Sequence, residues 1–176
     1  MKKVIALGGS NSKNSINKTL AIYTANKIET ATTTVVDLND YEMPLYGVDY
    51  ETENGIPKNA IKLNSLIEST DGLVISLAEH NGSYSASFKN TLDWLSRIDV
   101  KVWKDKPIAL LATSPGGRGG RTVLDSAKAY FPYLGGNVTT DFSLPNFYDN
   151  FSEDEISDNE LKEELSEKIR LFEQQL

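Results

Sequence analysis

The chain has 176 residues, of which 39% are hydrophobic and 24% charged, and its formal net charge at pH 7 is −7. A chain of this length is expected to form a single domain, residues 1–176, with a full hydrophobic core. The acidic balance and the scattered lysines and arginines argue against a nucleic-acid partner and against an anionic membrane surface. The absence of cysteine excludes disulfides, thiolate nucleophiles and cysteine-ligated metals.

No apolar segment approaches the length that spans a membrane. The basic start, Met1 to Lys3, and the apolar run behind it resemble the beginning of a signal peptide. That run is too short and leads directly into a Gly-Gly-Ser-Asn-Ser loop, so we interpret it as a strand. We therefore expect a soluble, cytoplasmic protein without a membrane partner.

Apolar runs that are typical of buried strands alternate with amphipathic helical stretches along the chain. The expected strands are Lys3–Leu7, Thr33–Leu38, Leu73–Leu77, Ile108–Thr113 and Asn137–Asp141. The expected helices run over about Ser15–Ile28, Lys58–Ser69, Ser85–Ile98, Arg121–Phe131 and Asp158–Gln174. Strands that alternate with helices in this way predict an α/β fold with parallel strands, right-handed crossovers and helices on both faces of the sheet.

In such sheets, ligands bind beyond the carboxyl ends of the strands. This rule points to three loops, Gly8–Asn17, Ala78–Ser87 and Ser114–Gly120. A fourth connection, Asp40–Pro57, is long and polar, and we expect it to cross the surface. Loops of that length in compact domains often cover a site.

The first loop, Gly8–Asn17, has the features of a phosphate site. It joins a buried strand to a helix, whose first turn has unpaired N–H groups and a positive dipole end. Short polar side chains add hydrogen-bond donors and Lys13 adds charge. The loop matches neither GxxxxGK[ST] nor GxGxxG, so it suits a terminal phosphate monoester, such as that of FMN. The alternative is that Ser15 merely caps the helix.

The second loop contains groups that would suit the edge and face of a planar ring, namely His80, Asn81, Gly82 and Tyr84. His80 is the only histidine, and no serine or cysteine motif or cluster of acidic residues accompanies it. We therefore expect no catalytic side chain and no metal site. A residue that lines the ligand is the favoured interpretation of His80, and an ordinary surface position is the alternative.

The helix that follows, Ser85–Ile98, is apolar over a wide arc because Trp94 and Ile98 fall away from its core-facing side. One interpretation is burial against a partner subunit, with Trp94 and Trp103 as anchors. The other is packing beneath the connection Val100–Lys106. The sequence does not decide between them.

The third loop places four glycines around Arg118 after a buried strand. Successive backbone N–H groups in such a stretch can form an anion-binding nest. Arg118 or Arg121 would add positive potential near a ring that becomes anionic on reduction. The alternative is a flexible loop that carries two solvated arginines.

Three motifs together resemble the flavodoxin-like NADPH-dependent FMN reductase family, which includes FMN, quinone, azo and chromate reductases. They are GGSNSKNSIN at 8–17, EHNGSYSASFKNTLDWLSR at 79–97 and SPGGRGG at 114–120, and the resemblance extends over nearly the whole chain. It implies a flavodoxin-like three-layer α/β/α sandwich with a five-stranded parallel sheet in the order 2-1-3-4-5. It also implies bound FMN, with NADPH or NADH as hydride donor, and a homodimer or homotetramer that forms through the 85–98 helix.

The resemblance assigns the cofactor-binding residues to the three loops. The first loop supplies Ser10, Ser15 and Asn17 as FMN-phosphate contacts, together with Ser12, Lys13 and Ile16. The second supplies Glu79, His80, Asn81, Gly82 and Ser83 along the flavin ring, and the third supplies Ser114, Gly116, Gly117 and Arg118 at its other edge. The sequence departs from the family pattern at Ser12, where arginine is common, and at Ala78 and His80, where proline and tyrosine are common.

We therefore expect an FMN-dependent NAD(P)H oxidoreductase. Ping-pong hydride transfer would run from NAD(P)H to FMN and on to a small-molecule acceptor, which would be a quinone, flavin, azo compound or metal oxyanion. FMN carries this chemistry, so no side-chain acid or base is required. The alternatives are a flavodoxin-type electron-transfer protein without nicotinamide turnover and a non-catalytic member that has lost flavin. The first loop lacks the Thr/Ser-x-Thr-Gly-x-Thr pattern of flavodoxins, which favours the reductase.

Overall fold

Five parallel strands form the centre of the fold in the computed structural model, which describes residues 1–176. They are β1 (Lys2–Gly9), β2 (Ala31–Val36), β3 (Gly72–Leu77), β6 (Lys106–Thr113) and β7 (Gly136–Leu144). Their spatial order is β2-β1-β3-β6-β7, so the expected flavodoxin-like order is confirmed. The central strands β1, β3 and β6 are buried along most of their length, as their apolar sequences predict for a sheet covered on both faces.

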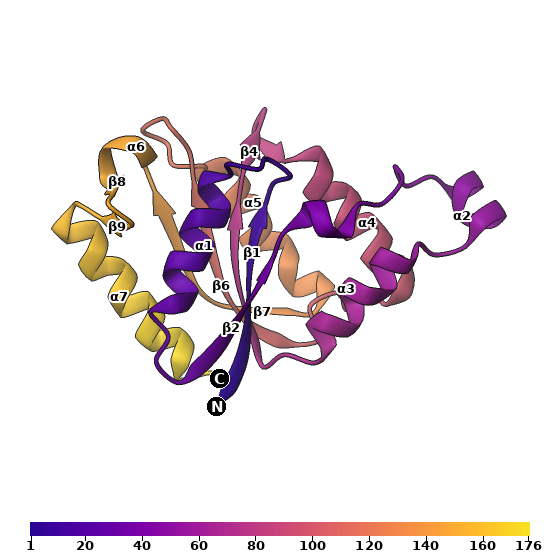
Figure 1. Cartoon of the computed structure of the whole chain (residues 1–176), viewed down its shortest axis with the longest axis horizontal. Coiled ribbons are helices and arrows are strands. Elements are labelled where there is room, and N and C mark those ends of the chain that lie inside the picture. The colour runs from indigo at the N-terminus through magenta and orange to yellow at the C-terminus, as the bar shows by residue number, and fades with distance from the viewer.

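Helices cover both faces of this sheet (Figure 1). On one face, α1 (Ile16–Asn26) and α7 (Asn159–Glu173) enclose a core of 17 buried residues. On the other, α3 (Lys58–Glu68), α4 (Ala86–Ile98) and α5 (Arg121–Tyr130) enclose a core of 22. Alternate strand residues point to opposite faces, so Ile5 joins the larger core and Ala6 the smaller one. No helix combines the length and the apolar character that crossing a membrane requires.

The structure also contains short elements that the sequence analysis did not predict. They are η1 (Leu38–Tyr41), α2 (Val48–Asn54), β4 (Glu79–His80), β5 (Ser83–Tyr84), η2 (Phe131–Leu134), α6 (Phe147–Asn150), β8 (Phe151–Ser152) and β9 (Glu155–Ile156). The last sheet strand, β7, continues to Leu144 and not only to Asp141 as predicted. Its second half alternates buried and half-buried residues, so it lacks the continuous apolar run by which the other strands were recognised.

The connection between β2 and α3 forms an arm, residues 42–57, that includes α2. No residue of α2 is buried, and Figure 1 shows this helix projecting beyond the body of the fold. The base of the arm is held to α4, because Trp94 Nε1 donates to the Pro44 carbonyl oxygen at 2.7 Å. In addition, Asn90 Oδ1 accepts a hydrogen bond from the Tyr46 backbone N–H at 2.8 Å.

The arm decides against the interpretation in which Trp94 and Trp103 anchor a partner subunit. Their side chains are 0% and 1% exposed within the single chain. Trp94 lies under the arm, with ring centroids of Tyr46 and Tyr50 at 5.0 and 5.9 Å, and Trp103 belongs to the larger core. The wide apolar arc of α4 is therefore satisfied by the chain itself. The polar composition of residues 40–57 gave no sign that two of its tyrosines would cover a helix face.

Candidate functional site

A cavity of about 240 Å³ opens where the carboxyl ends of β1, β3 and β6 meet. Residues from all three predicted loops and from α6 border it. The lining consists of Ser10, Ser12, Asn14, Ser15, Ile16, Asn17, Ala78, Glu79, His80, Thr113, Ser114, Pro115 and Tyr148. The topology therefore brings the three loops to one place, as the strand-end rule anticipates.

The N-terminus of α1 borders this cavity with free hydrogen-bond donors. Ser15 Oγ accepts from the Lys18 backbone N–H at 3.1 Å, so Ser15 does cap the helix. The backbone N–H groups of Ile16 and Asn17 have no acceptor within the chain. Ser10 Oγ accepts from the Ser12 N–H at 3.1 Å and so fixes the loop that leads to them. Free N–H groups at the positive end of a helix are the donors that a phosphate accepts.

The side chain of Asn17 is turned into the protein and is only 3% exposed. Its Nδ2 donates to the Thr113 carbonyl oxygen at 3.1 Å, and its Oδ1 accepts from the Thr113 N–H at 3.0 Å and from Ser76 Oγ at 2.7 Å. The amide thus joins α1 to β3 and β6. The sequence predicted that the Asn17 side chain would donate to phosphate, and the structure corrects this. The group of Asn17 that is available to phosphate is its backbone N–H.

Positive charge near the first loop is smaller than the sequence implies. Lys18 Nζ lies 2.5 Å from Asp37 Oδ2, and this hydrogen bond lowers the pKa of the Asp37 carboxyl below its ordinary value, with burial partly opposing the effect. Lys13 is exposed and is not among the residues that border the cavity. The donors at the cavity are therefore mainly uncharged hydroxyl and backbone N–H groups.

The second loop folds into a tight hairpin formed by β4 and β5. Asn81 and Gly82 occupy its turn with φ of 52° and 75°, the conformation that a two-residue type I′ turn requires. An Asn-Gly pair of this kind is a recognised hairpin signal, and the sequence analysis did not use it. Of the hairpin residues, Glu79 and His80 border the cavity, whereas Asn81, Gly82 and Ser83 are exposed outside it.

Only the first part of the third loop borders the cavity, through Ser114 and Pro115. Gly116 and Gly117 lie further out and are exposed, and their N–H groups have no acceptor within the chain. They remain the candidate donors for an anion at the outer edge of the site.

The two arginines of this region are engaged by neighbouring side chains. Arg118 Nη2 donates to Thr122 Oγ1 at 2.7 Å, on the first turn of α5. The Arg121 guanidinium lies 3.7 Å from the Asp141 carboxylate. Neither arginine is among the residues that border the cavity. The structure therefore shows no direct contact by which either one would place positive charge at the edge of the ring.

Tyr148 is the lining residue that lies outside every predicted loop and strand. It lies on α6, directly after β7, and is 70% exposed. Backbone hydrogen bonds from Asn146 to Gly116 and from Phe147 to Ser114, at 3.0 and 3.1 Å, attach α6 to the third loop. The sequence does contain a signal for this position, because two adjacent aromatic residues, Phe147 and Tyr148, follow the fifth strand. The prediction that this strand ends at Asp141 left them unassigned.

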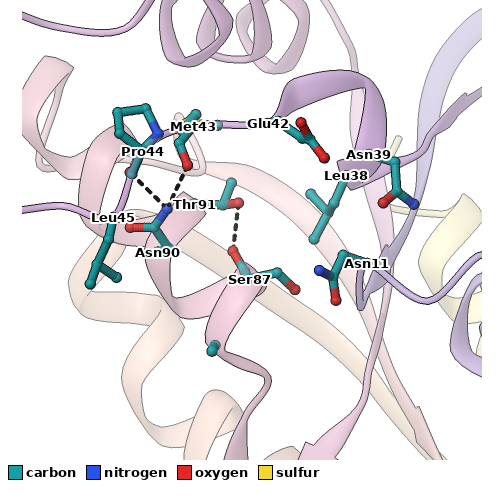
Figure 2. Close-up of a pocket in the computed structure, with 11 residues that line it drawn as sticks. Asn11, Leu38, Asn39, Glu42, Met43, Pro44, Leu45, Ser87, Asn90 and Thr91 are labelled. Atoms are coloured by element: carbon teal, nitrogen blue, oxygen red, sulfur yellow. Dashed lines mark hydrogen bonds between the residues drawn. The ribbon is translucent and has the colours of Figure 1, made fainter.

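A larger cavity of about 570 Å³ lies on the other side of the first loop, between the arm and α4 (Figure 2). Figure 2 shows Asn90 beneath the arm, where its Nδ2 donates to the carbonyl oxygens of Met43 and Pro44 at 3.4 and 3.1 Å. Asn11 borders this larger cavity, whereas the residues on either side of it border the smaller one. The first loop therefore separates the two cavities. No group of three or more histidine, aspartate and glutamate side chains is arranged to hold a metal ion.

Known proteins are similar to this chain in sequence and in fold. The model of the NADPH-dependent FMN reductase family matches residues 2–149. A quinone reductase of Escherichia coli K12 is 36% identical over 119 residues, which are 67% of this chain and 63% of that protein. An NADPH azoreductase of Bacillus sp. OY1-2 is 32% identical over 127 residues, 72% of this chain and 67% of that protein. The chain thus spans about two thirds of the length of these relatives.

Among solved structures, the flavoenzyme NAD(P)H:(acceptor) oxidoreductase FerB from Paracoccus denitrificans superimposes with a TM-score of 0.77. It is 25% identical, and the match covers 99% of this chain and 97% of that one. The apo form of an NADH:FMN oxidoreductase superimposes with a TM-score of 0.76 at 18% identity, over 100% of this chain and 90% of that one, and supports the fold.

The role of the Asn17 amide can be tested by denaturant unfolding. We expect Asn17→Leu to lower the free energy of unfolding by about 2–4 kcal/mol, because it leaves the Thr113 peptide group and the Ser76 hydroxyl without partners in the core. Asn26→Leu, at the exposed end of the same helix, is the matched control and should change stability by no more than about 0.5 kcal/mol. Equal effects of the two substitutions would contradict the assigned role.

Proposed function

Because the chain belongs to the NADPH-dependent FMN reductase family, we propose that it is an FMN-dependent NAD(P)H oxidoreductase that reduces small-molecule acceptors. Family membership confirms the predicted family, the oxidoreductase class and FMN as the cofactor of the family. The acceptor (a quinone, flavin, azo compound or metal oxyanion) and the ping-pong order of hydride transfer stay predictions.

The observation that carries this proposal is the phosphate end of the small cavity. Ile16 and Asn17 offer unpaired first-turn N–H groups there, and Ser10, Ser12 and Ser15 border the same space. A phosphate monoester needs several convergent donors and does not need a metal ion. The residues present therefore fit the phosphate of FMN.

The hairpin and the third loop are the candidate borders of the flavin ring. FMN, when bound, supplies the hydride-accepting ring, and the protein binds and orients it. The exposed N–H groups of Gly116 and Gly117 would donate to negative charge on the ring, and His80 would present its imidazole at the cavity edge. No paired acid and base is required from the side chains.

We also propose that the chain assembles as a homodimer or homotetramer through the face that carries the 85–98 helix. The arm on this face exposes Leu45, Val48 and Tyr50, at 82%, 65% and 40%. Light scattering on the purified protein is expected to give two or four times the 19.5 kDa of one chain, and Val48→Glu is expected to lower that mass. A monomer at micromolar concentration would contradict the proposal.

The proposed reaction is tested by the visible spectrum of the protein after incubation with FMN. We expect the flavin bands to bleach within seconds of anaerobic addition of NADPH or NADH, and to return when a quinone is added. Steady-state rates at varied donor and quinone concentrations are expected to give parallel double-reciprocal lines, because a single shared site implies ping-pong turnover.

Two outcomes would favour the alternatives. Bound flavin that stays oxidised with both nicotinamides would indicate a flavodoxin-type electron carrier. A protein that takes up no FMN would indicate a member of the family that has lost its cofactor.

The missing arginine at position 12 gives a separate test of the phosphate end. We expect Ser12→Arg to tighten FMN binding roughly ten- to hundred-fold, because a charge-assisted hydrogen bond to phosphate is worth about 1.5–3 kcal/mol. Riboflavin, which lacks the phosphate, should bind unchanged in a fluorescence titration. Asn11→Arg adds the same charge on the side of the larger cavity and is the matched control. Equal gains from both variants would indicate a general charge effect and not a contact at position 12.

A further inference from the structure

We propose that Glu79 is a positioning residue, whose carboxylate fixes the first turn of α5 and so joins the hairpin and the third loop into one wall of the flavin site. This inference rests on the proposed function, because it concerns the same cavity. Glu79 was expected to contact the flavin ring. In the structure it borders the cavity, and one of its carboxylate oxygens binds a helix.

Helix α5 begins without a cap of its own. Its N-cap residue is Gly120, at a φ of 72°, which has no side chain to accept a hydrogen bond. Glu79 Oε2 accepts from the Val123 backbone N–H at 3.1 Å. Val123 is the third residue of the helix, and its N–H is one that a capping side chain ordinarily takes. The cap is therefore supplied from the neighbouring loop, 44 residues earlier in the sequence.

The negative charge of Glu79 also suits this position, in addition to the geometry of its hydrogen bond. The first turn of α5 contains no acidic residue, so no other carboxylate there offsets the positive end of the helix. A carboxylate from the hairpin provides both the acceptor and the favourable charge. The two effects can be separated by substitution, because glutamine keeps the acceptor oxygen and loses the charge.

Hydrogen bonds attach the third loop to β7 and to the segment after it, and a further bond attaches the helix at its end to the hairpin. Ser143 Oγ donates to the Gly119 carbonyl oxygen at 3.0 Å, and the Asn146 N–H donates to the Gly116 carbonyl oxygen at 3.0 Å. These bonds attach the loop to β7 and its continuation. The Glu79–Val123 bond attaches the helix at the end of the loop to the hairpin. Without Glu79, the hairpin loses its hydrogen bond to the helix that follows the third loop, and we expect the space between hairpin and loop, where a flavin ring would lie, to be less well fixed.

The first measurement needs no flavin. Amide hydrogen exchange of the apo-protein, followed by NMR, is expected to show about ten-fold lower protection of Val123 in Glu79→Ala, since one hydrogen bond contributes about 1.4 kcal/mol. Protection in Glu79→Gln should stay within about two-fold of the wild type, because the acceptor is kept. Glu53→Ala, on the exposed helix α2, is the control and should leave Val123 unchanged.

The second measurement links this contact to the ligand. We expect Glu79→Ala to lower the affinity for FMN and for riboflavin by the same factor, roughly ten-fold. The ring end of the site is disturbed in this variant, whereas the phosphate loop is not. Glu79→Gln should retain wild-type affinity for both. Should Glu79→Ala not fold, Glu79→Asp keeps the charge, shortens the reach by one methylene and is expected to show the same losses.

Three outcomes would overturn the inference. Unchanged Val123 protection in Glu79→Ala would mean that the bond does not hold the helix. Lost protection with unchanged flavin affinity would mean that the helix does not position the ring. Equal losses of Val123 protection and of flavin affinity in Glu79→Gln and Glu79→Ala would mean that the carboxylate charge holds the helix, and not the hydrogen bond to Val123. The proposed function fails differently, by an absence of flavin binding or of NAD(P)H oxidation in the wild-type protein.

Discussion

The site depends on one buried amide, that of Asn17. Its hydrogen bonds to Ser76 and Thr113 satisfy polar groups that lie in the sheet, where no water competes for them. Thr113 Oγ1 continues the connection by donating to the Leu144 carbonyl oxygen at 2.7 Å, so α1 and three strands share one network. Because the first turn of α1 is fixed in this way, its free N–H groups are held in place before any ligand arrives.

The strands and long helices were predictable from local pattern. The strands β1, β3 and β6 are apolar runs, and α4 has an apolar side at helical spacing, so both lie within two residues of the predicted bounds. The first loop was predictable for a similar reason, since a strand, a small polar loop and a helix follow one another directly. What the residues of the site do with their side chains was not predictable.

The unpredicted contacts all join residues far apart in the sequence. Asn17 meets Thr113 across 96 positions, Trp94 meets Pro44 across 50, and Glu79 meets Val123 across 44. Sequence pattern reports which face of an element is buried, but it does not report which distant polar atom a side chain will find there. For this reason, the sequence did not show that the Asn17 side chain turns inward, that the arm covers Trp94 or that Glu79 caps a helix.

The uncharged character of the phosphate end has a kinetic consequence. The protein carries a formal net charge of −7, and the nearest lysine of the helix, Lys18, is neutralised by Asp37. An anionic cofactor therefore approaches a protein of the same overall charge, with no charged side chain other than Glu79 and His80 bordering the cavity. Its association is slower than a basic site would allow, and added salt, which screens the repulsion, speeds the encounter. Affinity at such a site is set by how long the cofactor stays once its hydrogen bonds have formed.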